Sequence, residues 1–214
     1  MAEITVKGTG KKKFTPDEVH VYMDLTAKAE EYGKVFSLIS SYSDGIKNDL
    51  NRIGFSKDDV KTTDFRVDPQ YEGYDENGVW KQRLVGYNAS HSMSLVFLKD
   101  DEKLNQVLNV LAMQESAPSF RVEYELSHID EAKDEVLSHA VTVSRRKAEI
   151  LASAAERKVG EILSITYGWK DAGAFVPLAY GKSVTRAAVS NTAMDLTPED
   201  IEIEEDVTVV FELL

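Results

Sequence analysis

The chain has 214 residues, of which 43% are hydrophobic and 29% are charged, and this is enough to bury a core in one large or two small globular units. Its formal net charge of −12, from 37 acidic and 25 basic residues, argues against nucleic acid and anionic membrane surfaces as main partners, because both would repel it. The absence of cysteine excludes disulfides, thiolate metal sites and cysteine nucleophiles.

Membrane and targeting signals are also lacking in the sequence as written. No apolar run reaches the roughly 18 to 20 residues that a membrane span needs. No apolar signal segment precedes the first strand-like residues at Glu3. The chain is therefore expected to stay in the cytoplasm, where it is made. Trimming of a natural precursor would instead place it in the periplasm or outside the cell.

The N-terminal segment combines glycines with a basic run. Gly8 and Gly10 are followed by three lysines, at positions 11–13. A third glycine and a following helix, which a dinucleotide-binding loop requires, are both missing. The segment therefore predicts a solvent-exposed turn between two strands.

The first half of the chain predicts a strand, a long helix and two further strands. Alternating apolar residues predict strands from Asp17 and from Tyr87, each with one buried face, and a third strand starts at Val60. Apolar residues three or four apart predict a helix to Ile53, with Gly54 at its C-terminal end. The residues expected to face the core are Val19, Val21, Met23, Leu25, Val35, Leu38, Ile39, Tyr42, Ile46, Leu50, Ala89, His91, Met93, Leu95 and Phe97.

The second half repeats this order after a shorter helix around residues 101–113. A strand from Phe120 precedes a long helix that Asp130 can cap and Gly160 ends, and two strands follow, the last from Ile201. The helix stripe is rich in small residues, so this helix can lie close to a sheet. The stripe consists of Leu137, Ala140, Val141, Ser144, Ala148, Leu151 and Ala155.

The repeated order indicates the fold class. The strand-helix-strand-strand pattern occurs in halves of about 15–115 and 116–214, which we expect to form a single domain. Strands outnumber helices, and several neighbouring strands are linked as hairpins. These features predict an α+β fold, a mostly antiparallel sheet with two long helices, rather than a doubly wound parallel sheet.

The stretch DPQYEGYDENGVWK, residues 68–81, is the most unusual local sequence. Asn77-Gly78 is a strong signal for a hairpin with a type I′ turn, because both residues tolerate positive φ. A calcium loop is excluded, because the sequence after Asp75 lacks the alternating oxygen ligands and the terminal glutamate. The stretch therefore predicts a β-hairpin whose acidic residues face solvent.

Aromatic residues mark two candidate contact surfaces. Those on or beside the hairpin either pack across its strands or meet another subunit. The segment from Trp169 to Thr197 has little pattern, and a loop of this length either binds, covers or bridges something or is an irregular excursion between strands. The candidate interface or ligand contacts are Tyr71, Tyr74, Trp80, Tyr87, Trp169, Phe175 and Tyr180.

Motifs for chemistry are incomplete. The GKS at 181–183 lacks the earlier glycine of a phosphate-binding loop, since Val176 stands there. His91 and His128 lie on apolar faces of predicted strands and can meet across a sheet, but two imidazoles alone make a poor metal site. No G-x-S-x-G motif accompanies the serines. The sequence therefore predicts no catalytic residue, no cofactor and no metal ligand.

Five blocks carry a family resemblance. They are ITVKGTGKKKFTPDEVHVYMDL, LNRIGFSKDDVKTTDFRVDPQY, VGYNASHSMSLVF, DEAKDEVLSHAVTVSRRKAEILASAAERKVGEILSITYG and EDVTVVFEL. In this order and spacing they resemble the SIMPL-domain family, which includes periplasmic immunogenic proteins and YggE-like proteins of bacteria. The resemblance covers nearly the whole chain. It implies an α+β domain without established catalytic activity, ring assembly in some members and a link to oxidative stress.

Three functional hypotheses follow. The leading one is a non-enzymatic homo-oligomer with an acidic surface, linked to a stress response. The second is a module that binds a small molecule or peptide at the 169–197 loop. The third is an enzyme of unknown reaction.

Overall fold

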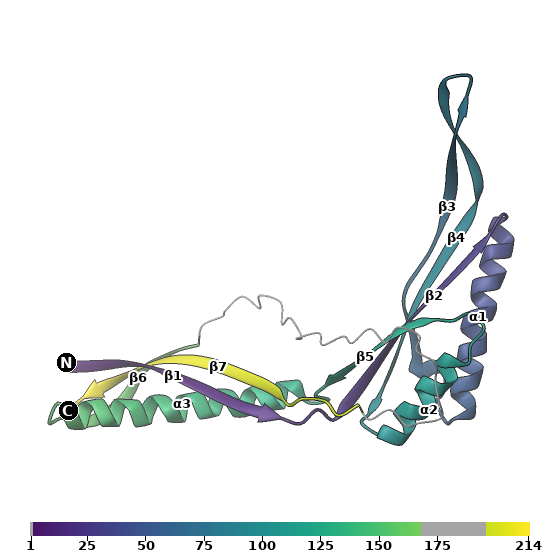
Figure 1. Cartoon of the computed structure of the whole chain (residues 1–214). Coiled ribbons are helices and arrows are strands. Elements are labelled where there is room, and N and C mark those ends of the chain that lie inside the picture. Colours follow the sequence, from purple (N-terminus) through teal and green to yellow (C-terminus); the bar gives the residue numbers. More distant parts are fainter. Residues whose placement is uncertain (1, 168–195) are drawn as a thin grey trace. The chain divides into compact units, whose positions relative to one another are not determined.

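The computed structural model describes residues 2–167 and 196–214, which form two compact units. Of the described residues, 2–17, 125–167 and 198–214 form unit 1, whereas 18–124 and 196–197 form unit 2. Each unit combines a mostly antiparallel sheet with helices (Figure 1). The predicted α+β fold class is therefore confirmed.

Unit 2 contains a four-stranded sheet in the order β3-β4-β2-β5. Its strands are β2 (Glu18–Ala29), β3 (Val60–Glu76), β4 (Val79–Leu98) and β5 (Ser119–Glu125). The helices are α1 (Tyr32–Arg52) and α2 (Asp101–Ala112), with a short 3-10 turn, η1 (Lys57–Asp59), before β3. Both helices lie on the same side of the sheet (Figure 1).

The core of unit 2 lies between this sheet and α1 and α2. The predicted alternation on β2 and β4 is confirmed, because Val21, Met23 and Leu95 are fully buried. Helix α1 contributes the predicted stripe, and Gly54 follows it with φ +100°, the left-handed conformation that favours glycine. The other buried residues of this core are Val19, Leu25, Ala27, Val35, Ile39, Ile46, Leu50, Phe55, Val60, Ala89, Met93, Leu104, Val107 and Leu111.

Unit 1 contains a three-stranded sheet in the order β1-β7-β6. Its elements are β1 (Ala2–Phe14), α3 (Ile129–Ala154), β6 (Val159–Tyr167) and β7 (Ile201–Leu213). Helix α3 runs along β1 and β7 (Figure 1). It approaches the backbone of β1 so closely that a Cβ on Gly8 would lie 2.0 Å from the Ala140 carbonyl oxygen. The small-residue stripe therefore does allow close packing, as predicted.

The predicted turn at Gly8 to Lys13 is wrong, because these residues lie inside β1. In the antiparallel register Gly8 pairs with Val207 and Lys13 with Glu202. The glycines are needed where the helix meets the strand. The lysines are tolerated in the strand because acidic residues surround them, as in the pair of Lys11 Nζ with Glu202 Oε1 at 2.6 Å.

The boundaries of α3 also differ from the prediction. The helix begins at Ile129, one residue before Asp130, and its N-cap residue is His128, which makes no side-chain capping bond. It ends at Ala154, after which Glu156 adopts φ 56°. Gly160 does not end the helix and lies in β6 instead. The left-handed residue after the helix is therefore a glutamate, which the glycine signal could not reveal.

The elements follow the predicted repeated order, but the strands are exchanged between the sheets. In unit 2, β2 precedes α1 and pairs with β4. The corresponding strand before α3 is β5, and it joins the sheet of unit 2. In unit 1, β1 pairs with β7 at the position that corresponds to β2 beside β4. Unit 1 is therefore completed by the N-terminal strand of the chain.

Candidate functional site

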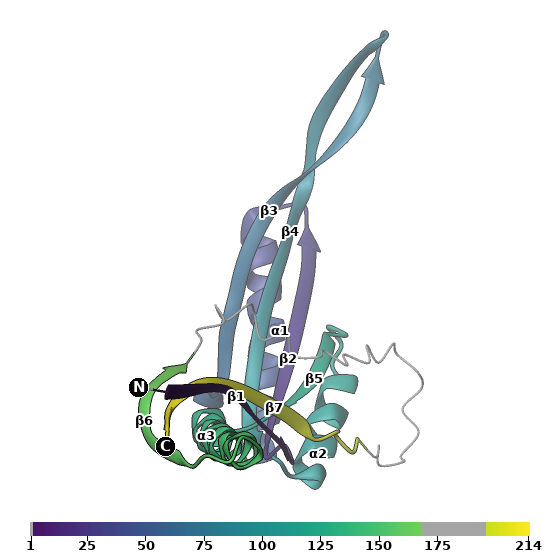
Figure 2. The ribbon, with the colours of Figure 1, turned by 90° about the vertical axis from the view of Figure 1, so that its left-hand side faces the viewer.

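The ends of β3 and β4 form a two-stranded ribbon, residues 70–86, which we call the β3–β4 ribbon. Strand β2 pairs with β4 only from Tyr87 to Leu98, so the ribbon residues pair only with each other. The ribbon twists and extends beyond β2 (Figure 2). At its tip Asn77 and Gly78 have φ values of 58° and 80°, which fit a type I′ turn. The predicted hairpin is therefore confirmed.

One face of the ribbon carries three large exposed apolar side chains together with Asp75 and Gln82. Tyr71 pairs with Leu84, and Trp80 pairs with Asp75 four residues nearer the tip. The exposed fractions of the Tyr71, Trp80 and Leu84 side chains are 59%, 71% and 48%. The Asp75 carboxylate on this face accepts a hydrogen bond from the Gly78 N–H at 3.0 Å. We call Tyr71, Trp80 and Leu84 the apolar face of the ribbon.

Trp80 is held in place by a glycine on the opposite strand. A Cβ built on Gly73 would lie 2.4 Å from Cζ2 of Trp80, so the indole ring occupies the space that another residue would fill. An aromatic ring over a cross-strand glycine covers the backbone that glycine leaves open. The ring is therefore fixed on the ribbon while most of it faces solvent.

The opposite face of the ribbon carries the charged residues. Arg83 donates to Glu72 with an Nη2 to Oε2 distance of 2.7 Å, and this hydrogen bond raises the pKa of the guanidinium. The Arg83 guanidinium also lies 5.8 Å from the ring centre of Tyr74. Lys81 pairs with Glu76 nearer the tip. Positive and negative charges therefore neutralise each other on this face.

The predicted contact residues do not form one cluster. Tyr71 and Trp80 lie on the apolar face, whereas half-buried Tyr74 lies on the charged face. Tyr87 lies at the base of the ribbon, where its ring makes an edge-to-face contact with Tyr32 at 5.6 Å. The remaining candidates, Trp169, Phe175 and Tyr180, lie outside the described residues, as does most of the 169–197 loop.

Sequence reasoning missed Leu84 as a member of the apolar face. Its position follows from register, because it is four residues after Trp80 on the same strand and opposite Tyr71. An alternation count that started at the Asn77-Gly78 turn would have found it.

The histidines lie in separate environments. His91 is buried on β4, and its Nε2 lies 2.9 Å from Oγ1 of Thr62. Burial lowers the pKa of His91, and the charge of Lys47 lowers it further. His128 lies outside any strand, since β5 ends at Glu125. The prediction that His128 lies on the apolar face of a strand is therefore wrong.

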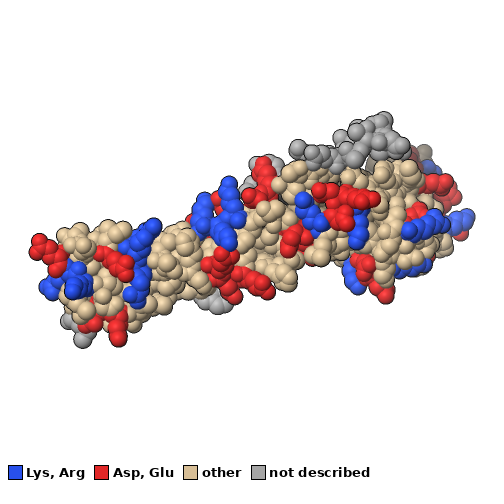
Figure 3. Space-filling model, turned by 90° about the horizontal axis from the view of Figure 1, so that it is seen from below, with Lys and Arg blue, Asp and Glu red and all other residues tan. Residues whose placement is uncertain are grey.

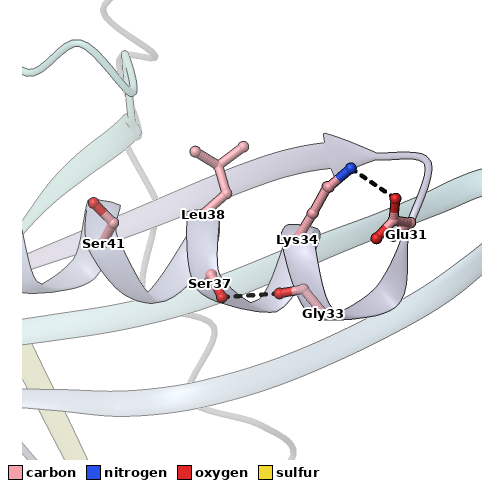
Figure 4. A pocket seen from close by; sticks show the side chains of 6 residues that line it. All are labelled: Glu31, Gly33, Lys34, Ser37, Leu38 and Ser41. Atoms are coloured by element: carbon pink, nitrogen blue, oxygen red, sulfur yellow. Dashed lines mark hydrogen bonds and ion pairs between the residues drawn. The ribbon is translucent and has the colours of Figure 1, made fainter.

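A shallow hollow lies at the start of α1 (Figure 4). Its polar groups already bind each other. Lys34 Nζ lies 2.6 Å from Glu31 Oε1, and the Ser37 hydroxyl donates to the Gly33 carbonyl at 2.9 Å. The remaining lining residues are Leu38 and Ser41. The hollow offers a ligand no set of converging polar groups.

Other site types find little support in the part of the chain that the structure describes. Within residues 2–167 and 196–214, no group of three or more histidine and carboxylate side chains is placed to hold a metal ion. None of the described helices is both long and apolar enough to span a membrane. On the face in Figure 3, basic and acidic side chains lie next to each other rather than gathering into an area of one sign.

Comparison with known proteins identifies the protein family of this chain. A search of curated proteins finds no match. A family model described as "SIMPL: Protein of unknown function (DUF541)" matches residues 4–211, which is nearly the whole chain. The resemblance seen in the five sequence blocks is thereby confirmed. The chain belongs to the SIMPL family.

Proposed function

We propose that this protein is a non-enzymatic assembly protein that joins copies of itself through the apolar face of the β3–β4 ribbon. The observation that carries the proposal is the exposure of Tyr71, Trp80 and Leu84 together on one face. Contiguous exposed apolar side chains of this kind mark interaction surfaces, and tyrosine and tryptophan are enriched where such surfaces bind.

A second copy of the chain fits this face for an electrostatic reason. The chain carries a net charge of −12, so copies repel each other wherever unpaired acidic residues meet. On the ribbon, Glu72 and Glu76 are paired within the chain and lie on the opposite face, and Asp75, near the tip of the apolar face, accepts a hydrogen bond from the Gly78 N–H. Two ribbons related by a two-fold axis can therefore pack apolar face to apolar face, with the charged faces in solvent.

The test is the mass of the particle in solution, measured by light scattering. The unchanged protein should give a defined multiple of the 23.9 kDa chain. The double variant Tyr71→Ser with Trp80→Ser should give a smaller particle with an unchanged circular dichroism spectrum, because both side chains are exposed in the single chain.

The matched control is Tyr74→Ser, which removes an aromatic ring from the charged face of the same ribbon. It should leave the mass unchanged. A monomeric unchanged protein would contradict the proposal as a whole. An oligomer whose mass the double variant does not alter would contradict the role of the ribbon.

A further inference from the structure

The outer strands of the two sheets differ in how they are protected against pairing with another chain. In the described residues these strands are β3 and β5 in unit 2 and β1 and β6 in unit 1. Exposed sheet edges present unpaired N–H and C=O groups, and proteins protect them with charged residues, especially lysine, and with proline. The protecting residues are Lys7, Lys11, Lys12 and Lys13 on β1, Lys61, Asp64, Arg66, Asp68 and Pro69 on β3, and Arg121, Glu123 and Glu125 on β5.

Strand β6 has no such protection over most of its length. After Glu161, its residues 162–167 read ILSITY, without charge, proline or glycine. A window of six residues with high β-propensity and no charge is the sequence type that pairs most readily with another strand. Bulges interrupt the pairing of β6 with β7 before Ser164, and the register is regular from Ser164 to Tyr167.

The apolar side chains of β6 are left uncovered by α3. Ile162, Ile165 and Tyr167 pair with Phe211, Val209 and Val207, so they lie on the face of the sheet that α3 covers. Their exposed fractions are nevertheless 38%, 50% and 45%. The reason is that α3 lies over β1 and β7, and a helix about 10 Å wide covers only two strands spaced about 4.8 Å apart.

We propose that β6 pairs antiparallel with β6 of a second copy, which joins two unit 1 sheets into one continuous sheet. The contact is distinct from the ribbon, although it rests on the proposed self-assembly. A second copy is the occupant that suits this edge, because its other described edges are charged, whereas its own β6 is not. Antiparallel pairing of ILSITY with itself places no charge opposite a like charge within the window, despite the net charge of −12.

Because the chain contains no cysteine, an introduced cysteine is the only thiol that a crosslinking reagent can modify. Ser164 and Thr166 are exposed and pair with Val210 and Thr208, on the face away from α3. Single variants Ser164→Cys and Thr166→Cys, treated with a short bismaleimide, should each give a covalent dimer on a denaturing gel. Ser153→Cys, an exposed serine on α3, is the matched control and should stay monomeric on the gel.

A charge placed on the edge gives an independent readout. Ile165→Lys should lower the particle mass in light scattering without unfolding the chain, because Ile165 is 50% exposed. Leu151→Lys, at a leucine of α3 that is 52% exposed, removes a similar apolar side chain and should leave the mass unchanged.

The outcomes separate the two interfaces. Crosslinking at 164 or 166 together with a lower mass for Ile165→Lys supports pairing through β6. Absence of the crosslink with an unchanged mass for Ile165→Lys overturns it, and β6 is then covered by the same chain or by a different protein. If Tyr71→Ser with Trp80→Ser still lowers the mass in that case, the proposed function stands without the β6 contact. If the unchanged protein is a monomer and neither Ser164→Cys nor Thr166→Cys crosslinks, both proposals fail.

Discussion

The carboxylate of Asp17 accepts two hydrogen bonds from Ser127, a residue 110 positions away in the chain. The Ser127 N–H donates to Oδ1 at 2.8 Å, and its hydroxyl donates to Oδ2 at 2.7 Å. The N–H of Asp17 in turn donates to the Glu125 carbonyl at 3.1 Å. These bonds connect the segment between β1 and β2 to the end of β5 and to the residues that follow it. They fix the chain where β1 leaves the sheet of unit 1.

Asp17 should make stability depend on acid pH. The hydrogen bonds from Ser127 lower the pKa of Asp17 below its usual value of 3.8. A carboxylate whose pKa is lowered by folding stabilises the protein above the unfolded pKa, and this contribution is lost as the pH falls through the folded pKa. Asp17→Asn should therefore unfold at lower urea than the unchanged protein at pH 7, with the difference shrinking below about pH 3.8.

Ser127→Ala tests the same contact from the other side. Because the site is exposed, the loss at neutral pH should be no more than about 1 kcal/mol. Asp44→Asn, at an exposed aspartate of α1, is the control. An Asp17→Asn difference that stays constant from pH 7 to about pH 3 would contradict the role of the charge.

His91 should destabilise the protein as the pH falls below neutral. Burial lowers its pKa in the folded state, so the unfolded chain takes up a proton near pH 6.5 while the folded chain does not. The free energy of unfolding therefore decreases as the pH falls below about 6.5. His91→Gln can keep a hydrogen bond to Thr62 but does not titrate, so its urea midpoint should vary less between about pH 7.5 and 5.5.

Lys47 provides a second measurement on His91. Its charge contributes to the lowered pKa, so Lys47→Gln should bring the pKa of His91, measured by NMR titration, closer to 6.5. An unchanged imidazole titration in Lys47→Gln would show that burial alone accounts for the shift.

The glycines of β1 should be intolerant of alanine. A Cβ at Gly8 or Gly10 would lie 2.0 Å from the Ala140 carbonyl oxygen or 2.1 Å from that of Val136. Backbone atoms of α3 cannot move aside without shifting the helix, so each substitution should cost about 3 kcal/mol in urea unfolding. Gly33→Ala in α1, where no atom lies within 4 Å of the added Cβ, should be neutral or slightly stabilising. Equal tolerance at Gly8 and Gly33 would contradict the close packing of α3 on β1.

Self-assembly through apolar faces should persist at high salt. Salt screens interactions between exposed charges but does not weaken apolar burial. The particle mass from light scattering should therefore be the same at about 0.1 M and about 1 M NaCl. Dissociation at the higher concentration would show that ion pairs, rather than Trp80 and its neighbours, hold the copies together.

Local patterns in the sequence determined much of the fold. The alternation in β2 and β4, the helical spacing of α1 and the Asn77-Gly78 turn each depend on residues close together in the chain. Each was therefore predicted correctly, because periodicity and turn chemistry act over a few residues. The hairpin aromatics were found in the same way.

Tertiary structure alone decided which strands pair and which side chains stay uncovered. The pairing of β1 with β7 joins residues such as Val6 and Val209, more than half the chain apart, and no local pattern encodes that choice. The close approach of α3 turns Gly8 and Gly10 from turn signals into packing positions. The same placement of α3 over β1 leaves β6 uncovered, so Ile165 is exposed although its partner Val209 is buried. Exposure depends on what lies across the sheet, and the sequence of one strand does not contain that information.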